Sequence, residues 1–63
     1  MADFEVSNHG TIVIFTPLTP VARDWVAKFL PEDAQCWAGG VVIEHRYISD
    51  VVNGAQRDGL MVR

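Results

Sequence analysis

The residues of this chain best suited to catalysis or metal binding are His9, Cys36, Glu44, His45 and Asp50. Imidazole, thiolate and carboxylate groups act in proteins as general acids and bases, as nucleophiles and as metal ligands. None of the five stands at a recognised ligand or catalytic spacing, such as two cysteines two residues apart or the HExxH pattern. We therefore predict no catalytic residue, no metal ligand and no cofactor.

The dipeptide Glu44-His45 is the strongest of these candidates, because we expect it where a strand ends and a helix begins. Backbone N–H groups point outward at such a junction and favour a bound anion. The turn lacks a glycine-rich phosphate loop, however, and Glu44 repels anions. A ligand-binding or enzymatic domain centred on this turn stays as an alternative, while His9 is expected in a solvated hairpin turn and Cys36 as an inert apolar residue.

Length and composition limit the classes to which the chain can belong. Its 63 residues form one domain, residues 1–63, and the 49% of apolar residues can build a core, which excludes intrinsic disorder. The one cysteine allows no internal disulfide, and no stretch resembles a signal peptide or a membrane span, so we expect a cytoplasmic protein without membrane contact. Five basic against eight acidic residues form no basic patch, so a nucleic-acid-associated protein is only an alternative.

The N-terminal half of the chain predicts a β-hairpin followed by a helix. Alternation of apolar and polar residues indicates a strand over 3–7, and a β-branched run indicates a second strand over 11–16, with turn residues between them. Thr19-Pro20 is typical of a helix start, and Pro31 ends that helix after about residue 30. Along it Val21, Trp25 and Phe29 recur at four-residue steps, which predicts that they face the sheet.

The C-terminal half predicts a strand over 41–44, a helix from 45 to about 57 and a last strand over 60–63. The resulting order is β-β-α-β-α-β. Strands joined through a helix are usually parallel, with right-handed crossovers that place the helices on one side. The predicted fold is therefore α+β, a two-layer sandwich in which a mixed four-stranded sheet carries two helices on one face.

Two helices cover only one face of such a sheet, so the other face stays open. Strand alternation assigns Ile12, Ile14, Val42 and Met61 to the open face, within a rim of polar residues. Trp37 is either a lid over the core or an exposed aromatic anchor. Since exposed apolar patches of soluble proteins are usually interaction sites, we predict that these five residues contact a second copy in a homodimer, or a protein partner.

Four segments resemble a group of short bacterial and prophage proteins of unknown function. They are VSNHGT at 6–11, TPLTP at 16–20, GVVIEHRY at 40–47 and DGL at 58–60. The resemblance spans essentially the whole chain, implies a small intracellular protein and transfers no functional residue. Together with the residues above, it favours a non-catalytic accessory protein that acts through protein binding.

Overall fold

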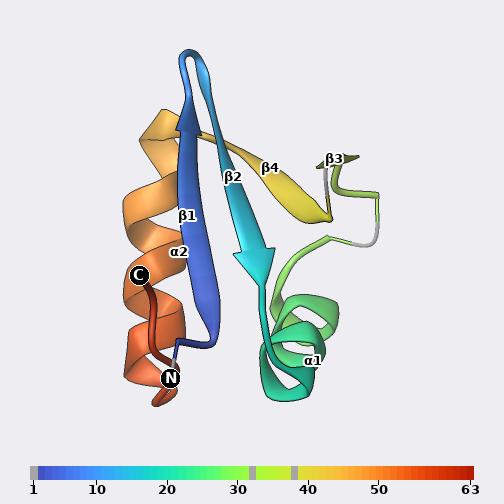
Figure 1. Ribbon diagram of the computed structural model, residues 1–63, viewed down its shortest axis with the longest axis vertical. Coiled ribbons are helices and arrows are strands. Elements are labelled where there is room, and N and C mark those ends of the chain that lie inside the picture. The colour runs from blue at the N-terminus through green and yellow to red at the C-terminus, as the bar shows by residue number, and fades with distance from the viewer. Residues whose placement is uncertain (1, 32, 38) are drawn as a thin grey trace.

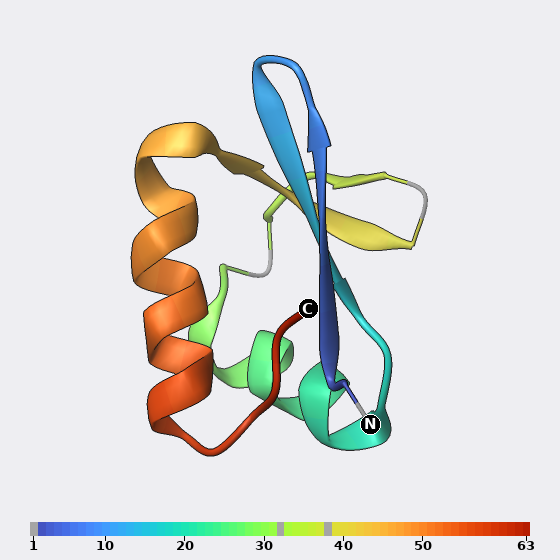
Figure 2. The same cartoon turned by 60° about the vertical axis from the view of Figure 1, so that its left-hand side comes forward.

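Six elements of secondary structure follow one another in the computed structural model, which describes residues 2–31, 33–37 and 39–63. In chain order they are β1 (Phe4–His9), β2 (Ile12–Pro17), α1 (Pro20–Phe29), β3 (Cys36–Trp37), β4 (Gly40–Glu44) and α2 (His45–Arg57) (Figure 1). The strands form one sheet of order β1-β2-β4-β3, and both helices lie on the same side of it (Figure 2). The predicted α+β class, with two helices on one face of the sheet, is confirmed.

The β1–β2 hairpin forms as the sequence predicts. Its strands pair antiparallel, with Val6 opposite Phe15 and Ser7 opposite Ile14. Gly10 takes a positive φ of 80° in the turn, and its N–H donates to the side-chain oxygen of Asn8 over 3.1 Å. A glycine preceded by a short side chain that bonds its own backbone is the local chemistry that a tight hairpin turn requires.

Helix α1 also begins where the sequence predicts. The Thr19 hydroxyl accepts the N–H of Ala22 over 3.1 Å and donates its own proton to Asp3 over 2.9 Å. Pro20 occupies the first turn of the helix, where a missing N–H costs nothing. Leu30 is the C-terminal cap, directly before Pro31. The N-cap Thr19 therefore provides an acceptor for a free N–H group of the first turn and also links α1 to Asp3, directly before β1.

The strand predicted over 41–44 is present as β4, but its direction relative to β2 differs from the prediction. The expected crossover would make the two strands parallel, whereas β4 runs antiparallel to β2. The reason is β3, a two-residue strand that the residue pattern does not predict. After α1 the chain first forms the sheet edge as β3 and then turns back at Gly39, whose φ is 81°, into β4. This extra reversal inverts β4.

The predicted last strand over 60–63 is reduced to a single parallel bridge, in which Val62 pairs with Phe4. Backbone bonds hold this segment against the outer edge of β1: Phe4 N–H donates to Met61 O over 3.0 Å, and Val6 N–H donates to Arg63 O over 2.9 Å. The four strands of the sheet are antiparallel where a mixed sheet is predicted, because β4 is inverted and the C-terminal segment forms only this isolated parallel bridge.

Helix α2 spans the region predicted for the second helix, although Glu44 at its N-cap makes no side-chain capping bond. The His45 ring instead bonds the carbonyl oxygen of Gly10 over 2.5 Å, which links the start of α2 to the hairpin turn. At the other end Gly59 takes a φ of 85°, the left-handed conformation that stops a helix. Within the described residues no helix is long and apolar enough to cross a membrane.

An aromatic cluster forms the core between the sheet and the helices. The rings of Phe4 and Phe15 stack with centroids 4.2 Å apart, and Trp25 meets Phe4 edge-on at 5.7 Å. The buried Trp25 donates its indole N–H to Asp58 over 2.7 Å, so its polar atom is satisfied. The predicted core position of Trp25 is confirmed.

The other two residues of the predicted α1 face, Val21 and Phe29, are not buried. Phe29 is 60% exposed although its ring lies 5.1 Å from that of Trp25. The residues that α1 buries are Ala22 and Trp25. Helical spacing alone therefore overestimates how much of this face is covered.

Candidate functional site

The strand register defines the open face, by which we mean the side of the sheet opposite the helices. Ile12, Ile14 and Val42 alternate with core residues and lie on this face. Trp37 joins them, because it pairs with Gly40, the neighbour of buried Val41. Met61 precedes Val62, which bridges Phe4 and packs on the core, so alternation turns the exposed Met61 toward the open face. All five predicted interface residues therefore share the open face.

Ile14 is nevertheless unavailable to a partner, because it is only 2% exposed. The cause is Gly40 on the neighbouring strand. A Cβ atom placed on Gly40 would come within 2.4 Å of the Ile14 side chain, so the isoleucine lies in the space that this glycine leaves free. The expectation that Ile14 contributes to an exposed patch is corrected: it is a buried support beneath that patch.

The indole of Trp37 extends across the open face. Its ring centroid is 5.2 Å from that of His9, with the two planes at 88°. His9 belongs to β1 and Trp37 to β3, and both β2 and β4 lie between these strands. The contact therefore bridges the face, and a cavity of about 480 Å³ remains between the two rings, Gln35 and the half-buried Ile12 and Val42.

Trp37 remains 54% exposed in this position. Two positions are expected for Trp37, a lid over the core or an exposed aromatic residue. The structure shows the second: Trp37 lies on the open face, not over the core, and about half of its surface is exposed. His9, expected to be a free turn residue, is held by Trp37 and by the Ser7 hydroxyl, 3.0 Å from its Nε2.

Charged residues flank the open face at the outer edge of the sheet. Arg63 donates to Glu5 over 2.7 Å beside the exposed Met61. Asp3 accepts the N–H of Met61 over 2.9 Å as well as the Thr19 hydroxyl. These bonds, that from Met61 first and that from Thr19 second, lower the pKa of the Asp3 carboxyl from 3.8. The edge is thus polar and tied to α1.

The candidate catalytic residues do not come together. The His45 ring is engaged with the Gly10 carbonyl, while Glu44 pairs with Arg46 over 3.2 Å. Cys36 is exposed at the sheet edge. In residues 2–31, 33–37 and 39–63 no three His, Cys, Asp or Glu side chains are grouped closely enough to hold a metal ion.

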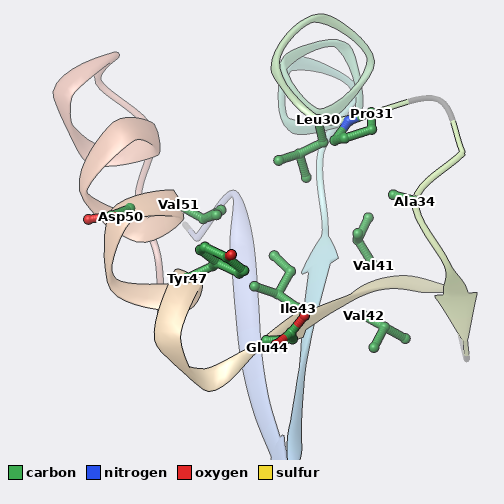
Figure 3. A pocket seen from close by; sticks show the side chains of 10 residues that line it. All are labelled: Leu30, Pro31, Ala34, Val41, Val42, Ile43, Glu44, Tyr47, Asp50 and Val51. Atoms are coloured by element: carbon green, nitrogen blue, oxygen red, sulfur yellow. The ribbon is translucent and has the colours of Figure 1, made fainter.

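A second concave surface lies on the helix side of the sheet, between the end of α1, β4 and the first turns of α2. We call it the helix-side groove. It has a volume of about 410 Å³, and its two acidic lining residues are Glu44 and Asp50, of which Asp50 directs its carboxylate outward, away from Ile43 and Leu30 (Figure 3). Its apolar lining comes from Leu30, Ala34, Val41, Ile43, Tyr47 and Val51.

The residue pattern does not predict this groove. Tyr47 and Val51 are one helical turn apart, a spacing that indicates a shared face, but only the structure shows that no helix from the described residues covers it. Tyr47 is 49% exposed as a result. In comparisons with protein-family models, curated proteins and solved structures, nothing matches the chain.

Proposed function

We propose that this protein is a small non-catalytic interaction module, acting in the cytoplasm, that binds a second copy of itself or another protein through the open face of its sheet. The observation that carries the proposal is Trp37, which lies across this face and is 54% exposed. A half-exposed tryptophan over apolar neighbours is the usual centre of a protein interface.

The surroundings of Trp37 support this reading. Ile12 and Val42 supply apolar contact area, while Gln35 and His9 offer hydrogen-bonding groups at the margin of the same cavity. Protein interfaces combine an apolar centre with a polar rim in this way. Because His9 holds the indole, the anchor loses little side-chain entropy when a partner binds.

Charge argues against the alternative of nucleic-acid binding. The open face carries Glu5 and Glu44, its Arg63 is already paired with Glu5, and the net charge of the chain is −3. A phosphate backbone would be repelled by such a surface. We therefore expect no salt-dependent shift when the protein is mixed with duplex or single-stranded DNA.

Sedimentation equilibrium of the wild type and of two open-face variants tests the homodimer. We expect Ile12→Lys and Trp37→Ala to lower the association constant at least about tenfold, since each removes or charges the apolar centre. Val21→Lys is the matched control, because Val21 is an apolar residue about as exposed as Trp37 and lies on α1, on the helix side of the sheet. Ile14 is left unchanged, since a substitution there would test folding instead of association.

A wild type that stays monomeric at high concentration excludes the homodimer and leaves a different protein as the partner. Affinity capture from the host with wild type, Trp37→Ala and Val21→Lys then tests whether such a partner binds the open face. The proposal requires a protein that the wild type and Val21→Lys retain and that Trp37→Ala loses. If no captured protein depends on Trp37 and the chain is monomeric, the proposal is wrong.

A further inference from the structure

The helix-side groove has the size and lining of a small-molecule site, and no residue of the open face contributes to it except at the Val42-Glu44 end of β4. Its volume of about 410 Å³ falls within the range of ligand pockets, roughly 300–1,000 Å³. Figure 3 shows Tyr47 projecting from α2, and Leu30 from the end of α1, into the space beside Ile43. The groove thus shares Val42 and Glu44 with the open face, and its other lining residues belong to the helix side of the molecule.

The backbone beneath the groove narrows the choice of occupant. Strand β4 pairs with β2 over residues 41–44 and with β3 at Gly40 and Val41, and the Val42 N–H donates to the Gln35 carbonyl oxygen over 2.8 Å, so it offers few free backbone groups to an added strand. An extended peptide in the groove would leave its own N–H and C=O groups without partners, which is costly. The groove therefore suits a compact apolar molecule better than a peptide strand.

The charges of the lining residues then indicate which polar group that molecule carries. The two carboxylates that line the groove belong to Glu44 and Asp50, and no basic side chain lines it, so an anionic ligand such as a fatty acid would be repelled. The chain itself places a cation beside two of the lining residues. The Arg46 guanidinium lies 3.2 Å from Glu44 and 4.8 Å above the centre of the Tyr47 ring. Carboxylate and aromatic face together form a standard environment for a cation.

We propose that the groove binds a small amphiphilic cation, an apolar body that carries an amine or guanidine group. The body contacts Leu30, Ile43 and Val51, and the cationic group replaces Arg46 between Glu44 and Tyr47. Arg46 is 70% exposed and its ion pair is of the weak surface kind, so it is easily displaced. In this arrangement Arg46 acts as an internal competitor of the ligand.

Three six-carbon probes that differ only in the head group test the chemistry: hexylguanidinium, hexanol and hexanoate. Binding is followed by amide chemical shifts in ¹⁵N NMR spectra. We expect shifts centred on Ala34, Val41 and Val51, with hexylguanidinium binding about tenfold more tightly than hexanol and hexanoate binding most weakly. Equal binding of the three probes, no binding at about 10 mM, or shifts centred on Trp37 and His9 would overturn the proposal.

Variants of exposed residues test the competition. Arg46→Ala should strengthen binding of hexylguanidinium about threefold or more while leaving hexanol unchanged, because the displaced group is a cation. Asp50→Asn should weaken hexylguanidinium only. Arg23→Ala, which removes the same charge from the exposed side of α1, is the control and should change neither. If Arg46→Ala weakens hexylguanidinium or acts like the control, Arg46 is not a competitor and the cation site is refuted.

Discussion

Two glycines provide a sharp test of the packing described above, because the same substitution should have opposite effects at each. Gly54 lies inside α2, facing the core tryptophan. A Cβ atom added there would be 3.6 Å from Cζ2 and 3.9 Å from Cη2 of Trp25, which is ordinary van der Waals contact. Gly54→Ala therefore adds a methyl group without a clash.

The expected gain follows from helix energetics. Glycine inside a helix costs roughly 0.5–1 kcal/mol relative to alanine, because the unfolded chain loses more freedom on folding. Contact with the indole adds a few tenths of a kcal/mol. We expect Gly54→Ala to raise the free energy of unfolding by about 1 kcal/mol and Tm by about 4–8 °C, measured by urea and thermal denaturation followed by circular dichroism.

Gly40→Ala is the contrasting variant. Its Cβ would lie 2.4 Å from Ile14 Cγ2, 2.6 Å from Thr16 Oγ1 and 3.3 Å from the Phe15 carbonyl oxygen, so the sheet must shift. Overpacking of this kind costs about 1–3 kcal/mol. If Gly54→Ala proves neutral or destabilising, Trp25 does not approach α2 as described; if Gly40→Ala is tolerated, the explanation of Ile14 burial fails.

Three further variants test the core and the caps. Thr19→Ala should lower the free energy of unfolding by about 0.5–2 kcal/mol in urea denaturation, because a helix cap is lost; an unchanged midpoint would contradict the capping role. Trp25→Ala should cost about 3–5 kcal/mol, close to the whole stability of so small a domain, and abolish the cooperative thermal transition; a transition that persists at the wild-type temperature would place Trp25 outside the core. Asp3 has a pKa below its ordinary 3.8 in the folded state, so its contribution to stability is present above that value and is lost as the pH falls below it. Asp3→Asn should therefore flatten the loss of stability below about pH 4, and an identical pH profile for wild type and variant would refute this.

The two proposed sites differ in how far the sequence could predict them. Alternation along the strands correctly places Ile12, Val42 and Met61 on the face opposite the helices, because side-chain direction in a strand depends only on position along it. It could not predict that Ile14 is buried, since that depends on Gly40 of a strand 26 positions away. The contact between Trp37 and His9 depends likewise on the order of the strands.

The elements that the sequence determined by itself are those whose stabilising contacts are local. The hairpin turn needs only Asn8 and Gly10, the start of α1 needs Thr19 and Pro20, and the end of α2 needs Gly59, so each could be identified within a few residues. The tertiary structure alone decided the direction of β4, the exposure of Phe29 and the existence of the helix-side groove. Each of these depends on where separate elements meet. The chain reversal at β3 could not be predicted, because a strand of two residues is too short to give a recognisable sequence pattern.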